Sequence, residues 1–452
     1  MVHEQKNMTT PLWVWSDLAQ ALGHPAIPGP DIHRFQTDSR TVQEGDLFIA
    51  LPGDPGPRFN PSYRSDVDGH NFIADAVRRG AVGVLAHNRV ETGVPVLYVE
   101  NTYDGLWALG RASSERMSGS RLAITGSSGK TTAKSFLTSA LDAYSAPGSF
   151  NNHIGVPISL ANMPADTVYG VFEVGTNHAG EIAPLTGLIQ PDIAIVLNVG
   201  NAHLENFDDQ EALYNEKISI FKELEDKSNA VWHESLNQSF GRSFGLSNDA
   251  DAKLVSLTGD RARYRLFGDE VSARVPGGGE HRAMTLAAVL LATVLSEGNL
   301  AKALELSADL VPKGRGNEVL IGDITIIDDS YNANPASMSA AIQTLCERSG
   351  RRRIAVLGEM LELGKLGIDT HRAVLAESHP LERVMCIGSA FQEPAEVEGL
   401  PWFQSADEEA LDWLISIVRP GDDVLVKGSN KVFWQSGFVQ AVEDQIRKTF
   451  LK

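Results

Sequence analysis

The chain has 452 residues and a net charge of −19, and this length is enough for two to four domains with separate hydrophobic cores. Its apolar runs, such as IAIVL at 193–197, are too short to span a bilayer, and the start MVHEQKNMTTPLW lacks the apolar segment of a signal peptide. The acidic balance makes nucleic acid a poor partner, and two cysteines without CxxC spacing, Cys346 and Cys386, indicate neither a disulfide framework nor a zinc site. We therefore expect a cytoplasmic protein without stable membrane insertion, which would bind anionic phosphates through local lysines, arginines and metal ions.

The first section of the chain, residues 1–117, predicts a mixed α/β domain. Three short apolar runs of strand length, DLFIAL (46–51), VGVLAH (82–87) and VPVLYV (94–99), are separated by helical segments. A loop rich in proline and glycine, LPGDPGPRFNPSYRSDVDGH, lies between the first and second of these runs.

The next two sections each predict a further α/β domain. From 118 to 312, the strand-like runs LAIT, TVYGVFEVG, IAIVLNVG and SNAVWH alternate with helical segments, which is typical of βαβ units around a mainly parallel sheet. A second alternating series covers 313–452, with ITIIDDSY, RIAVLGEM, RVMCIG and DDVLVKGS as its expected strands. The predicted fold class is therefore α/β, with domains at 1–117, 118–312 and 313–452.

The stretch RLAITGSSGKTTAKSFL (121–137) has the form of a phosphate-binding loop. A short strand, a glycine-rich turn and a helix that opens on Lys130 make up the P-loop arrangement. The turn glycines let the backbone approach phosphate, Lys130 adds a positive charge, and the Thr131 hydroxyl can ligate Mg²⁺. The strict pattern needs glycine where this chain has Ile124, so an ordinary turn between strand and helix stays as an alternative.

Polar side chains follow three strands of the predicted middle sheet. The first strand ends at the phosphate-binding loop, the second delivers Glu173, and the third delivers Asn198 and His203. Because open parallel sheets bind ligands at the carboxyl ends of their strands, we expect these groups to share one edge with Thr131. A carboxylate, an imidazole and a hydroxyl at one edge predict a Mg²⁺ site. Taken singly, a glutamate at a strand end is usually solvated and a lone histidine is usually structural.

The segment QEALYNEKISIFKEL (210–224) predicts a helix with Lys217 on its apolar face. This lysine is four residues from both Leu213 and Phe221, so it points toward the face that they form. Such a lysine can snorkel to solvent at the edge of the face. Alternatively it is desolvated, and its neutral amine can react with carbon dioxide to give a carbamate, which is a negatively charged metal ligand. The spacing leaves both interpretations open.

Motifs along nearly the whole chain resemble those of the Mur ligase family of peptidoglycan synthesis. They are TDSR (37–40), GDLFIAL, DGHNF, TGSSGKTT, FNNHIGVP (150–157), EVGTNHAGEI, NVGNAHLENF, NEKISIF, KGRGNEVL, IDDSYNANPASM (327–338), VLGEMLELG (356–364) and VLVKGS (424–429). DDSYNANPASM is the most discriminating, because it is similar to the members that add D-Ala-D-Ala, whereas tripeptide-forming members typically carry a Tyr-Ala-His version. The resemblance implies a UDP-substrate-binding N-terminal domain, a central P-loop ATPase-like domain and a Rossmann-like C-terminal ligase domain.

The resemblance also implies a reaction. The free carboxylate of UDP-N-acetylmuramoyl-tripeptide would be phosphorylated by ATP to an acyl phosphate, and the amine of D-Ala-D-Ala would attack it with release of phosphate. Both reactants are anionic and the phosphoryl transition state must be held by cations, so ATP and Mg²⁺ are the expected cofactors. These small molecules are the expected partners of a monomeric protein.

The expected site residues follow from matching the family's motifs to this sequence. Lys130, Glu173, His203 and Lys217 would be catalytic; Thr131 and Glu173 would hold one Mg²⁺, while His203 and Lys217, as the family's carbamylated lysine, would bear on a second. Ser39 and Arg40 would bind the UDP moiety, since a guanidinium suits a diphosphate. The nucleotide would be bound by Gly126, Ser127, Ser128, Gly129, Lys130, Thr131, Thr132, Asn151, Asn152, Arg315, Asn332 and Asn334.

The sequence has features in common with three other functional classes. A tripeptide-forming Mur enzyme or a folylpolyglutamate synthase would share the general plan, although DDSYNANP and TDSR disfavour both. A non-catalytic nucleotide-binding regulator would be expected to have lost residues such as Lys130 and Lys217, which are intact. A motor or transport ATPase would be expected to have an oligomeric arginine finger or membrane-facing segments, and the sequence indicates neither.

Overall fold

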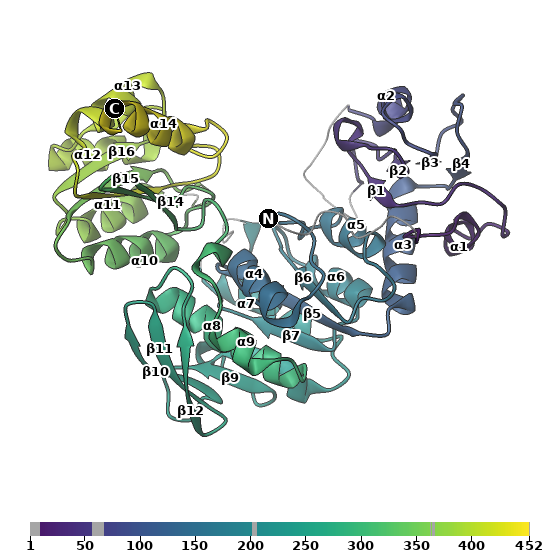
Figure 1. The fold of residues 1–452 in the computed structure, drawn as a ribbon, viewed down its shortest axis with the longest axis horizontal. Helices are drawn as coiled ribbons and strands as arrows, with labels where there is room; N and C mark the ends of the chain where they lie inside the picture. The colour runs from purple at the N-terminus through teal and green to yellow at the C-terminus, as the bar shows by residue number, and fades with distance from the viewer. Residues whose placement is uncertain (1–9, 57–66, 201–205, 362, 364–366, 452) are drawn as a thin grey trace.

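The computed structural model describes residues 10–56, 67–200, 206–361, 363 and 367–451 of the chain. These residues form three separate β-sheets, each covered by helices. In Figure 1 the middle section of the chain lies at the centre, and the N-terminal section (purple) and the C-terminal section (green to yellow) lie on opposite sides of it. This architecture confirms the predicted α/β fold class.

The N-terminal sheet has four parallel strands in the order β1-β2-β3-β4. The three predicted strands correspond to β2, β3 and β4, and the first strand, β1, was not predicted because its three residues are too few to establish an alternation. The elements are α1 (Trp15–Ala21), β1 (Arg34–Gln36), β2 (Asp46–Ile49), α2 (Ile73–Arg78), β3 (Gly83–Ala86), β4 (Val96–Tyr98) and α3 (Thr102–Arg116).

Helix α3 belongs to two hydrophobic cores. Leu106 and Leu109 on one side of the helix pack in the core of the N-terminal sheet. Tyr103 and Trp107 on another side pack in a core of the middle domain, and the Trp107 indole N–H donates to the carbonyl of His153 at 2.9 Å. The first and middle parts of the molecule are therefore joined through apolar contacts.

The middle sheet has the strand order β12-β11-β10-β9-β8-β7-β5-β6; strands β5 to β10 are parallel, and β11 is antiparallel to both of its neighbours, β10 and β12. The first four strands in chain order, β5 to β8, match the predicted runs. The bounds are β5 (Ser120–Thr125), β6 (Tyr169–Glu173), β7 (Ile193–Val196), β8 (Ala230–His233), β9 (Arg242–Gly245), β10 (Ala252–Thr258), β11 (Arg261–Leu266) and β12 (Asp269–Arg274). Ile124 pairs with Glu173 and Thr125 with Val196, so β5, β6 and β7 end at the same edge.

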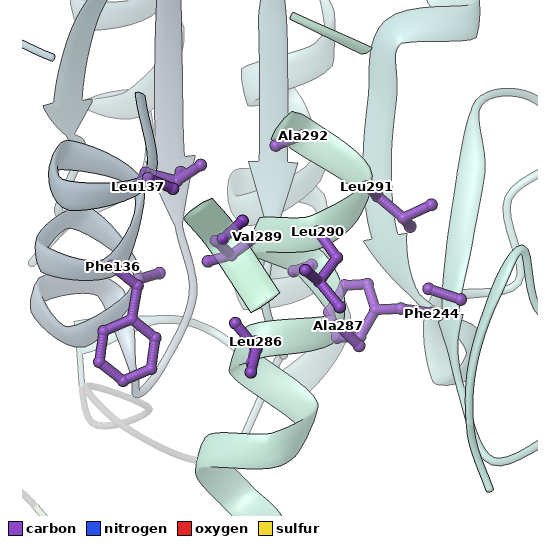
Figure 2. Close-up of a cluster of buried hydrophobic side chains, with 14 of the residues drawn as sticks. Phe136, Leu137, Phe244, Leu286, Ala287, Val289, Leu290, Leu291 and Ala292 are labelled. Carbon is purple, nitrogen blue, oxygen red and sulfur yellow. The ribbon is translucent and has the colours of Figure 1, made fainter. Parts of the chain in front are cut away.

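The helices of the middle domain are α4 (Lys130–Leu141), α5 (Gly155–Ala161), α6 (Ile182–Ile189), α7 (Gln210–Ile218), α8 (Glu280–Leu295) and α9 (Leu300–Leu304). Helix α8 is buried along most of its length. Figure 2 shows α8 between Phe136 of α4 and Phe244 of β9, with Leu286 and Leu290 among its buried side chains. An apolar helix of this kind is central to a domain core. No helix in the described part of the chain is long and apolar enough to cross a membrane.

The C-terminal sheet has the order β13-β14-β18-β15-β16-β17, and only the edge strand β13 is antiparallel. Its strands are β13 (Asn317–Ile321), β14 (Ile324–Asp329), β15 (Arg352–Gly358), β16 (Arg383–Ile387), β17 (Trp402–Phe403) and β18 (Asp422–Lys427). Its helices are α10 (Pro335–Cys346), α11 (Gly367–Glu377), α12 (Gln392–Glu398), α13 (Glu408–Ile417) and α14 (Phe438–Phe450). One apolar cluster packs α13 and α14 against the sheet and another packs α10, α11 and α12, so helices cover both faces, as in a Rossmann-like domain.

The predicted domain boundaries lie between these sheets. The boundary at 117/118 falls between α3 and β5, and the boundary at 312/313 falls shortly before β13. Helix α3 packs in the cores of both the N-terminal and the middle domain, so the first boundary separates two parts of the chain that share apolar contacts. Both boundaries stay predictions.

Candidate active site

The loop between β5 and α4 has the geometry of a phosphate cradle. Gly129 precedes the first residue of α4 in the left-handed conformation, with φ 80°, which glycine adopts without strain. Lys130 follows at the helix N-terminus, and its ammonium donates to the carbonyl of Gly126 at 2.6 Å. Burial lowers the pKa of Lys130, and the charge of Glu173 opposes that shift. The loop thus brings a partly desolvated cation to the positive end of a helix, where an anion is favoured.

Asn198, at the end of β7, holds this loop in place. Its main-chain carbonyl accepts from the N–H of Ser127 at 3.1 Å, and its side-chain oxygen accepts from the N–H of Ser128 at 3.0 Å. Its amide nitrogen donates back to the carbonyl of Ser128 at 3.3 Å. The sequence predicted Asn198 at the sheet edge, and the structure gives it a supporting role beneath the loop.

Thr131 and Glu173 are in contact, as expected from their positions at the ends of neighbouring strands. The Thr131 hydroxyl donates to Oε2 of Glu173 at 2.9 Å, and Asn151 donates to Oε1 of the same carboxylate at 2.8 Å. Ser149 contacts the Thr131 hydroxyl at 3.0 Å. Glu173 and Thr131 are both buried, so this group of polar side chains is fixed in position rather than solvated at the surface.

Lys217 is buried in the interior, with 1% of its surface exposed. Desolvation lowers the pKa of its amine well below the ordinary value, the positive charge of Lys130 lowers it further, and the charges of Glu216, Glu181 and Glu173 oppose the shift. The interpretation that Lys217 snorkels to solvent is therefore wrong, and the desolvated amine of the other interpretation is confirmed. Whether carbon dioxide adds to it stays a prediction.

Two glutamates near Lys217 accept hydrogen bonds from the main chain. Glu216, next to it on α7, accepts from the N–H groups of Gly180 at 2.8 Å and Ile182 at 2.7 Å, at the start of α6. Glu181 accepts from the N–H of Asn177 at 2.6 Å in the loop that follows β6. Sequence reasoning did not single out either carboxylate. The sequence gives little indication of the Glu216 contact, because it depends on α6 and α7 being neighbours in space.

Arg315 reaches the same edge from the C-terminal side. Its guanidinium lies 3.5 Å from the hydroxyl of Ser149 and 4.4 Å from the centre of the Tyr331 ring. Through Ser149 it connects to Thr131, so the structure brings the second and third predicted domains together at the phosphate-binding loop.

The asparagines predicted for the nucleotide site have different environments. Asn332 is exposed, and its main-chain carbonyl accepts from Lys427 at 3.1 Å. Asn334 caps α10, because its side-chain oxygen accepts from the N–H of Ser337 at 2.9 Å. Asn152 likewise accepts from the N–H of Gly155 at the start of α5. The side-chain oxygen of Asn334 thus already serves as a helix cap, and that of Asn152 bonds the main chain at the start of α5.

The remaining predicted residues lie elsewhere or outside the described chain. Ser39 is buried in a short helical turn after β1, and the exposed Arg40 beside it pairs with Asp38 at 2.7 Å. Thr132 is buried on α4. His203 lies outside the described residues.

Sequence reasoning missed Ser149 and Lys134. The Lys134 ammonium is buried and donates to the carbonyls of Ala146, at 2.8 Å, and Gly148, so it holds the segment that leads to Ser149. Lys134 is four residues after Lys130 and therefore lies on the same side of α4, a spacing that could have identified it.

The arrangement fits one Mg²⁺ ion. Magnesium in phosphoryl-transfer sites takes one or two protein oxygens, and substrate phosphates and waters complete its shell. The adjacent oxygens of Thr131 and Glu173 match this requirement. Within the described ranges, no group of three or more His, Cys, Asp or Glu side chains has the arrangement of a metal site.

Comparison with known proteins gives consistent similarities. The sequence matches the Mur ligase middle domain over residues 124–292 and the Mur ligase glutamate ligase domain over residues 314–430. A UDP-N-acetylmuramoyl-tripeptide–D-alanyl-D-alanine ligase of Rickettsia prowazekii (strain Madrid E) is 32% identical over 382 residues, which are 78% of this chain and 81% of that protein.

Two solved structures are similar over almost the full length. A crystal structure of MurF from Acinetobacter baumannii aligns with a TM-score of 0.80 and 29% identity, covering 96% of this chain and 99% of that one. A crystal structure of MurF ligase from Thermotoga maritima in complex with ADP aligns with a TM-score of 0.76 and 28% identity, covering 92% of this chain and 98% of that one.

Proposed function

The chain belongs to the Mur ligase family, and we propose that it is the ATP-dependent ligase that joins D-Ala-D-Ala to UDP-N-acetylmuramoyl-tripeptide in peptidoglycan precursor synthesis. The observation that carries this proposal is the junction at the phosphate-binding loop, where Thr131, Glu173 and Arg315 from two domains converge through Ser149. Relatives named for this activity match most of the chain, and the Mur ligase domain matches at 124–292 and 314–430 include these residues.

The reaction has two steps. A carboxylate oxygen of the tripeptide attacks the γ-phosphorus of ATP, and the bond from that phosphorus to the β,γ-bridging oxygen breaks to release ADP. The amine of D-Ala-D-Ala then attacks the carbonyl carbon of the acyl phosphate. The tetrahedral intermediate expels inorganic phosphate, and the nitrogen loses a proton as the amide forms.

The protein's contribution to the first step is to hold charge and geometry. Lys130 and the helix N-terminus behind it stabilise the charge on the β- and γ-phosphates, and Arg315 approaches the same phosphates from the C-terminal domain. Asn198 keeps the loop in its shape through its hydrogen bonds to the main chain of Ser127 and Ser128. This positioning is most of what phosphoryl transfer requires, because the transition state is loose.

Thr131 and Glu173 would hold Mg²⁺, which when bound neutralises the phosphate oxygens. Lys217, as its carbamate, would add negative charge near a second ion; its burial beside Lys130 and Glu173 supports that role. The dependence on Mg²⁺, a cytoplasmic location and a monomeric state are parts of this proposal.

The test is phosphate release with each substrate omitted in turn. We expect phosphate release only when ATP, UDP-N-acetylmuramoyl-tripeptide and D-Ala-D-Ala are all present. The mass of the amide product should equal the masses of the tripeptide substrate and D-Ala-D-Ala together, less that of one water. Equal turnover with glutamate in place of D-Ala-D-Ala would favour a glutamate-adding ligase. Sustained ATP hydrolysis without any amine would contradict the ligase assignment.

A further inference from the structure

Arg282, in the first turn of α8, is a buried arginine whose guanidinium spans the junction between two domains. One nitrogen, Nη1, donates to the carbonyls of Gly277 at 2.7 Å and Gly278 at 3.2 Å within the middle domain. The other, Nη2, donates to the carbonyls of Arg315 at 3.0 Å and Gly316 at 3.1 Å, just before β13 of the C-terminal domain. The planar fork of a guanidinium suits two pairs of acceptors, and a lysine could not bond all four in this way.

The same turn is held from the opposite side by Asp328 of β14. Its carboxylate accepts from the N–H of Gly314 at 3.1 Å, and its main-chain carbonyl accepts from the N–H of Gly316 at 2.6 Å. The N–H groups of Gly314 and Gly316 are therefore bonded to the C-terminal sheet, while the carbonyls of Arg315 and Gly316 are bonded to the middle domain through Arg282.

Gly316 lies very close to the guanidinium of Arg282. This residue has φ 82°, and a Cβ atom there would lie 2.1 Å from Nη2 of Arg282. Any side chain at this position would displace the guanidinium, so the glycine and the arginine depend on each other. Burial lowers the pKa of Arg282, and the charges of Asp329 and Glu318 oppose that shift. A cation buried against neutral carbonyls is costly unless each donor is satisfied, so the contact is selective for one arrangement of the turn.

We propose that Arg282 is a positioning residue that fixes the main chain at Arg315, so that the Arg315 guanidinium is presented to ATP in the phosphate-binding loop. The side chain of Arg315 extends from the clamped turn to Ser149, which contacts Thr131. Arg282 acts through Arg315 and not by contact with ATP. The inference rests on the proposed function, in which Arg315 contacts the nucleotide.

A double-mutant cycle in the full-length protein tests this. Arg282→Gln should raise KM for ATP or lower kcat by about tenfold or more in the wild-type background, and by less than about threefold when Arg315 is already alanine, because residues that act through each other are not additive. Equal losses in both backgrounds would overturn the proposal. If Arg282→Gln does not fold, Arg282→Lys takes its place in the same cycle, since it keeps the charge but loses the fork.

Arg116→Gln is the matched control. Arg116 is also partly buried and donates to two carbonyls, of Leu12 and Met163, each at 3.0 Å, but it is part of the N-terminal junction. Its loss should change KM for ATP by less than about twofold in either background. An effect on ATP as large as that of Arg282→Gln would mean that any buried arginine at a junction gives this result, and would overturn the proposal.

Hydrogen exchange of the nucleotide-free protein separates this inference from the proposed function. Arg282→Gln should increase exchange at the amides of Gly314 and Gly316, whatever reaction the protein performs, because the turn is then held from one side only. Unchanged exchange would overturn the clamp even in a fully active ligase. If the clamp opens but Arg315→Ala proves fully active, the ATP role of Arg315 is wrong, and the positioning role of Arg282 is wrong with it.

Discussion

At the residue scale, the edge of the middle sheet brings two lysines of lowered pKa close to the carboxylate of Glu173. Lys130 and Lys217 each lose solvation, and the charge of Lys130 lowers the pKa of Lys217 further. Two nearby cations are easier to maintain when phosphates are bound or when one of them becomes uncharged. This explains why a carbamate at Lys217 would suit the site: it replaces a repelling cation with an anion.

Lys130→Ala should remove about 2–4 kcal/mol of transition-state stabilisation, the scale of losing one electrostatic donor. The loop should keep its shape, because Asn198 holds its N–H groups independently of the lysine. Steady-state kinetics of the variant give the magnitude, and its circular dichroism spectrum reports the fold. Near-normal kcat in folded Lys130→Ala would mean that this loop is not catalytic.

Lys217→Ala and Lys217→Arg should both be nearly inactive. The alanine leaves no anion, and the guanidinium keeps a positive charge and forms no carbamate at neutral pH. Short-chain carboxylic acids added to Lys217→Ala should restore part of the activity by supplying the missing charge in the vacated space. Amines of similar size are the control, and rescue by amines instead would mean that Lys217 acts as a cation.

The lowered pKa of Lys217 also sets the direction of a pH effect. Carbon dioxide adds only to the neutral amine, and a lowered pKa extends the neutral form to lower pH than for an ordinary lysine. Activity should therefore persist near neutral pH and fall as acid protonates the amine. Added bicarbonate should shift this loss of activity to lower pH in the wild type. It should cause no such shift in Lys217→Ala whose activity has been partly restored by a short-chain carboxylic acid. If bicarbonate does not shift the pH at which wild-type activity falls, Lys217 does not form a carbamate.

At the element scale, the register of three strands creates the site. The pairing of Ile124 with Glu173 and of Thr125 with Val196 places the phosphate-binding loop, the carboxylate and Asn198 at one level. The apolar runs of β5, β6 and β7 made these strands predictable, because strands buried on both faces are continuously hydrophobic. The antiparallel strands β10, β11 and β12 were not predicted, although β11 alternates Arg261, Arg263 and Arg265 with buried residues, which is the pattern of a half-buried strand.

Substitutions of two neighbouring asparagines at the start of helix α10 should have different effects on stability. Asn334→Ala should lower the stability of the C-terminal domain by about 1 kcal/mol, because the capping bond to the Ser337 N–H is lost. Asn334→Asp keeps an acceptor and should restore most of this stability. Asn332→Ala removes an exposed side chain and should leave stability within about 0.5 kcal/mol of wild type. Urea denaturation with hydrogen exchange at α10 measures both changes, and equal stabilities for Asn334→Ala and Asn332→Ala would contradict the cap.

At the scale of the whole molecule, the two junctions between domains differ in kind. The N-terminal and middle domains share apolar packing through α3, whereas the apolar clusters of the C-terminal domain are built from residues between 319 and 450. The described contacts between the middle and C-terminal domains include the hydrogen bonds of Arg282 and Arg315. A junction of hydrogen bonds around a turn can change its geometry more readily than one that shares a packed core.

The protein should therefore unfold in two parts. The C-terminal domain should unfold separately, while the N-terminal and middle domains unfold together, because separating them would expose the apolar side chains of α3. Calorimetry combined with hydrogen exchange of the three sheets would reveal this order. Saturating ATP should bring the two unfolding temperatures closer together, since the nucleotide would contact both the phosphate-binding loop and Arg315. A single transition in the absence of nucleotide would contradict the distinction between the junctions.

The sequence by itself determined the fold class, the middle-sheet strands β5 to β8, the phosphate-binding loop and the family resemblance. These follow from local patterns: apolar runs, a glycine-rich turn before a helix, and short motifs in a fixed order. It also identified Lys217 as a residue that points inward, but left two interpretations open, because burial depends on what packs against the helix.

Only the tertiary structure decided which polar groups meet. The bond between Thr131 and Glu173 depends on strand pairing, the fixation of α7 by Glu216 depends on its contact with α6, and the clamp on the Arg315 turn joins Arg282 to residues more than thirty positions away. Asn334 has an ordinary polar side chain in the sequence, and its role as a cap became evident from the helix that begins beside it. The physical reason is that burial and hydrogen bonding between distant residues depend on the three-dimensional packing, which local sequence patterns do not specify.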